Sequence, residues 1–455
     1  MTDLSSKVAE YAKHFSGRLL QPSDPAWETA RRIHNGLVDK RPALVAQCLG
    51  TADIAYAVRL AREHSLEIAV RGGGHNVAGR ASVDGGMMID LSSMRYVHVD
   101  PVAHTARAAG GTLWAQFNRE TQVHGLATTG GVVSTTGVAG LTLGGGLGFL
   151  MPKYGMALDN LLSVELVLAD GQVVRAAADQ NPDLFWAVRG GGGNFGVASS
   201  FEFRLHKVGP IVTGGLAAWP VNRARDVLRL FRDLAAKAGD DLMLVAALIT
   251  APDATTRLAA IGACYAGDTR TGESAIKPIK SFGTPVMDAI GPIPYAELNA
   301  MLDASYPAGA RNYWKSHFCA DLNDDAIDTM VAAFLRCPSP MGQIVIEHFH
   351  GATTRIAPSA TAYALRTSGF NLLVLAQWMA SADDAAGIAW ARDSYSALKG
   401  FGGPSRYLNY LDQDDMGDRA LAAAYGPNVR RLQSVKAKYD PENVFHLNLN
   451  IAPRT

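Results

Sequence analysis

Three clusters of glycine lie in the first half of the chain and constrain its fold more than any other feature. They occupy residues 71–76 (RGGGHN), the run from Thr128 to Gly148, and residues 189–197 (RGGGGNFGV). Glycine loses more conformational entropy on ordering than any other residue, so three ordered clusters need a compensating interaction. A phosphate-bearing ligand can supply it, because glycine loops let backbone N–H groups converge on an anion. The clusters together predict a bulky dinucleotide site.

Each cluster has a simpler alternative when it is taken alone. Residues 71–76 follow a predicted strand, but no helix with the spacing of G-x-G-x-x-G follows them, so they could form an ordinary turn. His75 would then be a polar turn residue. The run from Thr128 to Gly148 could instead pack two crossing segments without a ligand. It is the occurrence of all three that favours the ligand.

The hydrophobic pattern predicts two kinds of structure, which meet near residues 205–212. Before that boundary, short apolar runs alternate with turn residues and predict strands at 43–49, 67–70, 87–91, 96–100, 105–109, 161–168, 173–176 and 195–205, with helices at 52–64 and 181–188. After it, longer amphipathic segments predict helices at 223–237, 325–335 and 429–438, with strands at 243–250, 258–265, 343–348 and 371–378. This mixture predicts an α+β fold with helices on one face of an antiparallel sheet.

Composition excludes several classes of partner. The formal net charge is zero and the pI is about 7.2, which disfavours binding to nucleic acid or to a membrane surface. No apolar run reaches the ~20 residues of a membrane-spanning helix, and residues 1–20 lack the apolar stretch of a signal peptide. The four cysteines are far apart, as in proteins of a reducing compartment. We therefore expect a cytoplasmic protein.

The motifs around the glycine clusters resemble one family closely. Residues 71–76, the run to Gly148 with its continuation through 152–155 and 159–160, and residues 186–196 are similar to the berberine bridge enzyme-like branch of the vanillyl-alcohol oxidase flavoprotein superfamily. The closing pattern agrees, in residues 407–410 (YLNY), 425–428 (YGPN), 439–445 (YDPENVF) and 448–451 (NLNI). The resemblance covers essentially the whole chain in the expected order.

The resemblance implies a domain organisation. Residues 1–207 would form a PCMH-type FAD-binding domain of two α/β subdomains, and residues 411–455 would return to it. Residues 208–410 would form a substrate-binding domain with an antiparallel sheet covered by helices.

The resemblance also implies a cofactor site for FAD. His75 would bond covalently to the 8α-methyl group of the flavin, and the backbone around it would cradle the pyrophosphate. The implied cofactor-binding residues are His75, Arg71, Gly72, Gly73, Gly74, Asn76, Val133, Thr135, Thr136, Gly137, Gly140, Gly144, Gly145, Tyr154, Asn160, Asn194, Gly196, Val197, Asn448 and Asn450. Bicovalent members carry a cysteine where this chain has Val133, so we expect a single tether. Thr136 occupies a position that influences oxygen access in the family, and it leaves oxidase and dehydrogenase both open.

The implied activity is oxidation of a small organic substrate, such as an alcohol, sugar, amine or alkaloid-like molecule, with oxygen as electron acceptor. By the resemblance Tyr410 would remove a proton from the substrate while hydride passes to flavin N5, with Tyr407 as the second candidate base. A buried, hydrogen-bonded tyrosine is the alternative for Tyr410. Other functions left open are a dehydrogenase with another acceptor and a flavin-binding protein without turnover.

Three residues on predicted strands of the substrate domain are candidate pocket residues: Trp378, His348 and His350. For each of them, core packing is favoured over a direct catalytic role. His348 and His350 have the i, i+2 spacing that places two side chains on one face of a strand. No third metal ligand accompanies them, so we predict no metal site.

Overall fold

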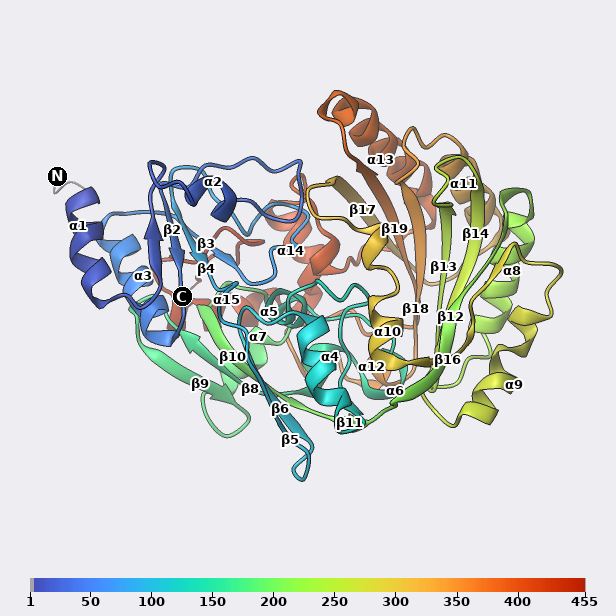
Figure 1. Cartoon of the computed structure of the whole chain (residues 1–455), viewed down its shortest axis with the longest axis horizontal. Coiled ribbons are helices and arrows are strands. Elements are labelled where there is room, and N and C mark those ends of the chain that lie inside the picture. Colours follow the sequence, from blue (N-terminus) through green and yellow to red (C-terminus); the bar gives the residue numbers. More distant parts are fainter. Residues whose placement is uncertain (1–3, 455) are drawn as a thin grey trace.

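The computed structural model describes residues 4–454 and begins with a small sheet that carries the first glycine loop (Figure 1). The strand order is β1-β2-β4-β3, in which β2 and β3 each run parallel to β4. Its elements are α1 (Leu4–Tyr11), β1 (Arg18–Leu20), α2 (Trp27–Ala30), β2 (Leu44–Gln47), α3 (Thr51–Glu63), β3 (Ile68–Arg71) and β4 (Met87–Asp90). The succession of β2, α3 and β3 confirms the strand–helix–strand unit predicted before the first glycine loop. That loop begins where β3 ends, at Arg71.

A second sheet follows the order β5-β6-β10-β8-β9, and the third glycine cluster leads into its central strand, β10. All of its strand pairs are antiparallel, and β8 and β9 form the predicted hairpin. Its strands and helices are β5 (Val97–Asp100), β6 (Thr105–Ala109), α4 (Trp114–Gln122), α5 (Val138–Leu143), α6 (Met151–Tyr154), β8 (Leu161–Val167), β9 (Val173–Ala177), α7 (Pro182–Val188) and β10 (Val197–Arg204). Two short strands, β7 (Leu126–Ala127) and β11 (His206–Lys207), pair beside it.

The large third sheet is antiparallel, with the order β15-β12-β14-β13-β18-β19-β17 and β16 pairing with β12. Its strands are β12 (Ile211–Pro220), β13 (Leu242–Thr250), β14 (Arg257–Tyr265), β15 (Met287–Asp288), β16 (Gly291–Pro294), β17 (Arg311–Cys319), β18 (Gln343–Phe349) and β19 (Gly369–Trp378). Helices cover one face: α8 (Ala224–Ala235), α9 (Thr269–Lys280), α11 (Asp324–Leu335) and α13 (Asp384–Leu398). This confirms the predicted α+β fold.

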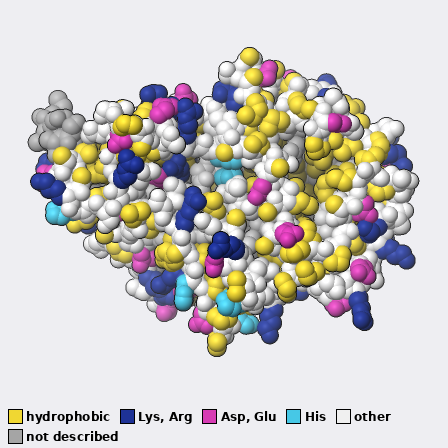
Figure 2. All heavy atoms as spheres, in the orientation of Figure 1, with side chains coloured by type: hydrophobic (Ala, Val, Ile, Leu, Met, Phe, Trp, Pro, Cys, Tyr) yellow, Lys and Arg dark blue, Asp and Glu magenta, His cyan; other side chains and the backbone are white. Residues whose placement is uncertain are grey.

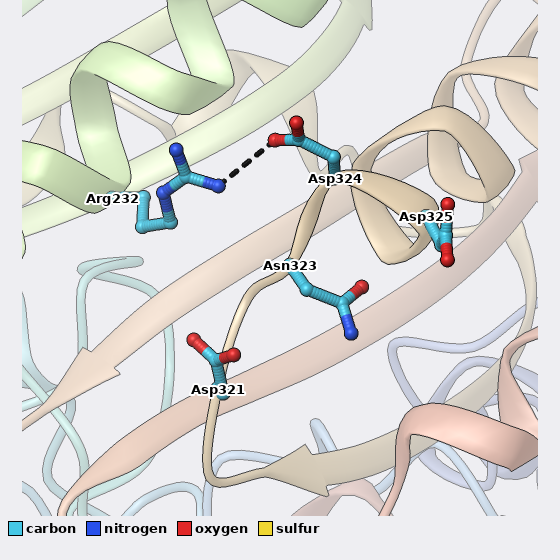
Figure 3. A pocket seen from close by; sticks show the side chains of 5 residues that line it. All are labelled: Arg232, Asp321, Asn323, Asp324 and Asp325. Atoms are coloured by element: carbon cyan, nitrogen blue, oxygen red, sulfur yellow. Dashed lines mark hydrogen bonds and ion pairs between the residues drawn. The ribbon is translucent and has the colours of Figure 1, made fainter.

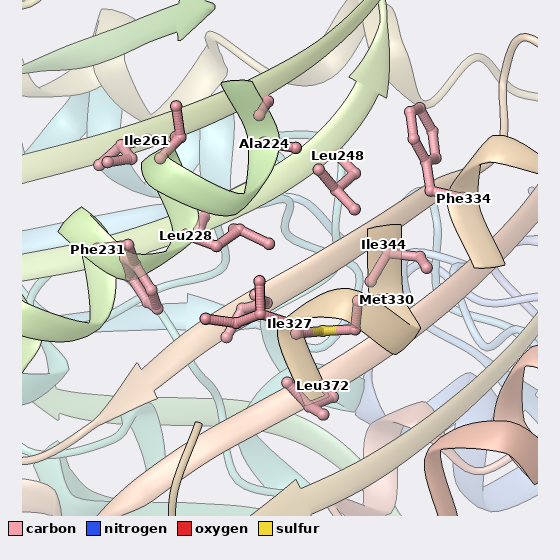
Figure 4. Packing of buried hydrophobic residues seen from close by; sticks show 14 of the residues in the cluster. Ala224, Leu228, Phe231, Leu248, Ile261, Ile327, Met330, Phe334, Ile344 and Leu372 are labelled. Carbon is pink, nitrogen blue, oxygen red and sulfur yellow. The ribbon is translucent and has the colours of Figure 1, made fainter. Parts of the chain in front are cut away.

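The helix-covered face of the third sheet is a close-packed core (Figure 4). Leu228 and Phe231 of α8 and Ile327 and Met330 of α11 pack over side chains of the strands, and all four are fully buried. The other face is turned towards the glycine clusters. Two small helices lie between the third sheet and the first half of the chain: α10 (Tyr295–Ala300), which contacts α4, and α12 (Ala352–Arg355), which contacts α6.

The C-terminal segment returns to the first half of the chain (Figure 1). Its helices are α14 (Gly417–Tyr425) and α15 (Val429–Tyr439), and α15 contacts α7. Lys436, which is fully buried, anchors this segment by donating hydrogen bonds to the Asp440 carboxylate and to the backbone oxygens of Asn194 and Phe445. The tail is thereby bound to the third glycine cluster.

Short 3-10 helices complete the structure: η1 (Ala12–His14), η2 (Ala157–Asn160), η3 (Val221–Arg223), η4 (Asp303–Ser305), η5 (Ser381–Asp383), η6 (Lys399–Phe401), η7 (Leu408–Tyr410) and η8 (Gly426–Asn428). Across residues 4–454, no helix combines the length and apolar character that crossing a membrane requires.

Replacing Lys436 by methionine should destabilise the fold by about 3–5 kcal/mol, because it leaves the buried Asp440 carboxylate without its partner. Urea denaturation followed by circular dichroism measures the change. The matched control is Lys438→Met, two residues away in α15, whose ion pair with Asp183 is solvent-exposed and should contribute at most about 1 kcal/mol. Equal losses in the two variants would contradict the anchoring role of Lys436.

Candidate active site

A cavity of about 1060 Å³ lies between the glycine clusters and the uncovered face of the third sheet. Many of the residues predicted for the site line it: Gly72, Gly73, Gly74, His75, Asn76, Val133, Thr136, Gly137, Gly140, Gly144, Gly196, Tyr407, Tyr410 and Asn448. The cavity therefore joins the first and third glycine clusters, the run between them, the tail and the substrate-domain sheet in one space.

Two kinds of glycine shape the cavity. A Cβ atom on Gly73 would lie 2.4 Å from the backbone nitrogen of Gly137, so these two loops can cross only because both residues lack side chains. Gly140 is different, because a Cβ there would meet nothing within 4 Å. The space beside it lies in the cavity and is left for a ligand. Crossing backbones beside an open, partly apolar space fit a long dinucleotide such as FAD.

His75 is held in a defined orientation at the rim of this space. Its ring stacks on His34, with 3.8 Å between ring centroids, and its Nε2 lies 3.1 Å from the Thr135 hydroxyl. Burial, and to a smaller extent the neighbouring His34, lower the pKa of His75 to about 3. The imidazole is therefore neutral near pH 7, which leaves a ring nitrogen able to act as a nucleophile.

Glu347 and Tyr410 form a buried acid–base pair in the wall of the cavity. The Tyr410 hydroxyl donates to one carboxylate oxygen of Glu347 at 2.9 Å, and the Asn371 side-chain amide donates to the other at 2.7 Å. Burial raises the pKa of Glu347 to about 7, although both hydrogen bonds oppose the shift. Trp314 packs edge-on against the Tyr410 ring at 5.9 Å between centroids. A carboxyl group poised near neutral pH is suited to accept a proton.

Tyr407 lies beside this pair but its hydroxyl is already occupied. It accepts N–H groups from Gly146 at 3.0 Å, Leu147 at 3.4 Å and the Asn409 side chain at 2.9 Å. Burial raises the pKa of Tyr407 to about 12 and raises that of Tyr410 well above its ordinary value, so the hydrogen bonds rather than the pKa values distinguish the two. Because a hydroxyl oxygen has two lone pairs, no acceptor site remains for a substrate proton. Tyr407 holds the glycine-rich backbone, and Tyr410 is the better placed of the two candidate bases.

The three predicted pocket residues on the strands lie on the wrong face of the sheet. Trp378 packs in the core between the third sheet and its helices, and it donates its indole N–H to Asp384 at 2.8 Å. His348 and His350 do share a face, with their rings stacked at 4.0 Å, but His348 stacks on Phe370 in that same core. None of the three lines the cavity. In β18 the side chain that faces the cavity belongs to Glu347, one residue earlier.

Other predicted cofactor residues support the site without lining the cavity. The Arg71 guanidinium binds the Asp90 carboxylate, with its Nε at 2.8 Å, and so fixes the start of the first glycine loop. The Asn194 side chain bonds to Gly191 and to Leu449 and Ile451 of the tail. The others that do not line the cavity are Thr135, which contacts His75, together with Gly145, Tyr154, Asn160, Val197 and Asn450. Tyr154 stacks on His206, to which Asn160 also bonds.

Sequence reasoning missed several side chains of the cavity wall. Glu347 and Gln377 are polar residues within largely apolar strands, and an acidic residue in such a strand is itself a signal. Trp314, which the sequence leaves as a core or rim residue, lines the cavity together with Tyr306. His34 lies before the first glycine loop and carries no sequence signal.

A second, shallow depression lies at the start of α11 (Figure 3). It is lined by Arg232, Asp321, Asn323, Asp324 and Asp325. Arg232 pairs with Asp324 at 2.9 Å, and the Asn323 side chain accepts the Ala326 N–H as a helix cap. These polar groups satisfy one another, so the depression is explained by helix capping. Among residues 4–454, no group of three or more His, Cys, Asp or Glu residues is arranged to hold a metal ion.

Comparison with known proteins agrees with this geometry. Residues 42–177 match an FAD binding domain family, and residues 406–452 match the family described as berberine and berberine like. The (R)-6-hydroxynicotine oxidase of Paenarthrobacter nicotinovorans is 33% identical over 463 residues, covering 99% of each chain. An FAD-linked oxidoreductase of Dictyostelium discoideum is 30% identical, covering 98% of this chain and 97% of the relative.

Solved structures give the same result. The crystal structure of 6-hydroxy-D-nicotine oxidase from Arthrobacter nicotinovorans matches with a TM-score of 0.88 at 30% identity, covering 100% of this chain and 99% of the other. Glucooligosaccharide oxidase from Acremonium strictum matches with a TM-score of 0.87 at 25% identity, covering 99% of both. Fold and cavity thus define an FAD-linked oxidoreductase. The chain belongs to the berberine bridge enzyme-like family of these enzymes.

The raised pKa of Glu347 should make the stability of the protein depend on pH. Its carboxyl has a pKa of about 7 in the folded state against 4.5 as the ordinary value, so the folded state favours the neutral form. This stabilising contribution is complete below pH 4.5 and is lost as pH rises through 7. At pH 8 the free energy of unfolding of Glu347→Gln should therefore exceed that of the unsubstituted protein by up to about 3 kcal/mol, and its unfolding temperature should be higher. At pH 4.5 this gain should be absent.

Thermal unfolding at the two pH values, recorded by calorimetry, measures the difference. Glu273→Gln, at an exposed carboxyl of α9, is the control and should respond equally at both. A Glu347→Gln effect independent of pH would show that this carboxyl ionises normally.

Proposed function

We propose that this enzyme oxidises a small organic substrate with FAD tethered covalently to His75, using Tyr410 and Glu347 to take up the substrate proton and oxygen as the electron acceptor. The observation that carries the proposal is the meeting, in one cavity, of a neutral, clamped histidine and a buried tyrosine–carboxylate pair. The substrates in view are alcohols, sugars, amines and alkaloid-like molecules.

The tether is supported by the geometry around His75. With Nε2 beside the Thr135 hydroxyl, Nδ1 is the ring nitrogen left to bond to the flavin. Glucooligosaccharide oxidase is described as carrying a 6-S-cysteinyl, 8α-N1-histidyl FAD, so a structurally similar relative has a histidine-linked cofactor. Val133 replaces the cysteine of bicovalent members, and the cysteines of this chain are buried away from the cavity. A single bond through His75 is the proposed attachment.

Tyr410 and Glu347 can move the substrate proton in a short relay. When bound, FAD supplies the two-electron acceptor that takes a hydride from the substrate carbon. The Tyr410 oxygen accepts the proton from the substrate O–H or N–H, and its own proton passes to the Glu347 carboxylate at 2.9 Å. The relay needs Glu347 in its ionised form at the start. Asn371 holds the carboxylate in place throughout.

Oxygen is proposed as the acceptor because the relative at 33% identity is named an oxidase. Thr136 lines the cavity at the position that influences oxygen access in the family. Release of hydrogen peroxide during turnover tests this assignment, whereas dye reduction without peroxide would assign a dehydrogenase.

The flavin should remain with the polypeptide after acid precipitation and should leave it in His75→Ala. The cause is the covalent bond, which denaturation does not break. The measurement is the absorbance of pellet and supernatant, followed by mass spectrometry of the flavin-bearing peptide. His104→Ala, on an exposed turn, is the control and should keep its flavin in the pellet. Flavin in the supernatant of the unsubstituted protein would rule out the tether.

Turnover should rise with pH through the pKa of Glu347, near 7, because only the carboxylate accepts the relayed proton. Tyr410→Phe should lower kcat/KM by about 10²–10⁴-fold, the usual contribution of a general base, and Glu347→Gln should also remove the rise with pH. Peroxide or dye-coupled rates from pH 5 to 9 measure both effects. Tyr363→Phe is the control, since the buried Tyr363 hydroxyl has no hydrogen-bond partner in the described structure. An unchanged rate in Tyr410→Phe would eliminate this base.

A further inference from the structure

The floor of the cavity is the uncovered face of the third sheet, and it is divided into an apolar and a polar part. Strands β12, β14 and β13 contribute only small or apolar side chains to it, apart from Thr250 at the end of β13: Leu216, Gly262, Leu258, Met243, Val245, Ala247 and Ile249. Strands β18, β19 and β17 add the polar side chains Glu347, Gln343, Gln377 and Asn312. Figure 2 shows hydrophobic side chains gathered over the half of the molecule that holds this sheet. Such a floor suits a largely apolar molecule with polar groups at defined points.

Gln377 is the polar group whose bonding is incomplete. It lies in β19 on the same face as Leu373 and Leu375, which also line the cavity, and its side chain is fully buried. Neither its amide nitrogen nor its amide oxygen has a hydrogen-bond partner in the described structure. Burying an amide without partners is unfavourable, so such groups in native proteins call for an explanation. A ligand group with both a donor and an acceptor would satisfy this amide.

The position of Gln377 defines the length of that ligand. Glu347 pairs with Asn371 across β18 and β19, and Gln377 lies six residues further along β19. At about 3.3 Å per residue, the two ends of the floor are about 20 Å apart. Between them the floor is formed by Val345, Leu373 and Leu375 together with Gln343. A molecule that reaches both ends is elongated and mostly apolar in its middle.

The charge of the floor restricts which chemical group of the ligand can bind at Gln377. The arginine and lysine of β17 are Arg311, whose guanidinium is bound to the Asp384 carboxylate, and Lys315, whose ammonium is bound to the Asp412 carboxylate at 2.7 Å. Neither lines the cavity. Of the described cavity residues that the sheet supplies, none is a lysine or arginine. A carboxylate would find no counter-charge at Gln377. An uncharged amide or lactam, which offers one donor and one acceptor in a plane, fits the glutamine amide.

We propose that Gln377 forms a distal subsite, and that the substrate is an elongated, mostly apolar alcohol or amine with an uncharged amide-like group at the end far from the oxidised carbon. The inference rests on the proposed function, because the oxidised carbon must lie at Tyr410. Gln377 contributes affinity and selects the length of the substrate. It takes no part in the proton relay.

The first test needs no substrate. Gln377→Leu should unfold at the same or a higher temperature than the unsubstituted protein, because the amide it removes has no partner within the chain. Asn371→Leu is the comparison and should lower the unfolding temperature, since that amide is bonded to Glu347. A clear loss of stability in Gln377→Leu would show that its amide is bonded within the protein, and would overturn the subsite.

The second test measures binding to the flavin-loaded enzyme through the visible spectrum of the flavin. We expect ω-hydroxydodecanamide to bind with a Kd about tenfold lower than that of dodecanol, which corresponds to about 1.4 kcal/mol of binding free energy. The short ω-hydroxybutanamide should bind far more weakly than either, because it cannot reach both ends of the floor. Gln377→Leu should abolish the preference for the amide and leave dodecanol binding intact. Gln343→Leu makes the same change on β18, opposite Leu375 and so nearer to Glu347 than Gln377 is. This variant should retain the preference.

The outcomes separate the two proposals. Protein without flavin, or with flavin but no turnover of any alcohol or amine, would refute the proposed function, while the stability comparison would still judge Gln377. An active enzyme that does not distinguish the two long ligands, or whose preference survives in Gln377→Leu, would refute the distal subsite and leave the oxidoreductase intact.

Discussion

The crossing of two glycine loops at Gly73 and Gly137 is the constraint on which the rest of the site depends. Backbone atoms of the loops approach so closely that a side chain on either residue would collide with the other loop. The crossing fixes the first loop, and with it His75, against the segment that carries Thr135 and Thr136. The same loops line the cavity. Ordering them costs conformational entropy, and the ordered loops give the cofactor site its shape.

The third sheet separates stability from chemistry by using its two faces differently. Side chains alternate between the faces along each strand, so His348 packs under the helices while Glu347 enters the cavity. The helix-covered face is a continuous apolar core, which leaves the other face free to vary in polarity without loss of packing. The buried Glu347 carboxyl on that free face has the pKa of an acid–base group because burial disfavours its ionised form.

The sequence was sufficient to predict the fold class, the strand before the first glycine loop and the dinucleotide site, since these follow from periodicity and from glycine clusters. It was not sufficient to decide which face of a strand is covered. Both faces of β19 are buried and mostly apolar, so the pattern of Trp378 and its neighbours carries little information about sides, and a shift of one residue reverses the assignment. The helix α5 inside the glycine run was also missed. Three of its residues, Val138, Gly140 and Thr142, are poor helix formers, and tertiary bonds such as that from the Val138 N–H to the Thr112 carbonyl hold the helix.

The pKa of the Glu347 carboxyl cannot be predicted from its residue type, because it depends on burial and on hydrogen bonds that form only in the fold. Two hydrogen bonds, from Tyr410 and Asn371, favour its ionised form, yet burial outweighs them and keeps the pKa near neutrality. With stronger pairing the carboxylate would be too weak a base, and with none it would remain protonated. The balance requires a buried position that desolvates the group and a tyrosine that donates to it from the cavity wall. The third sheet and η7 supply these from segments far apart in the sequence, so the proposed proton relay could form only in the folded chain.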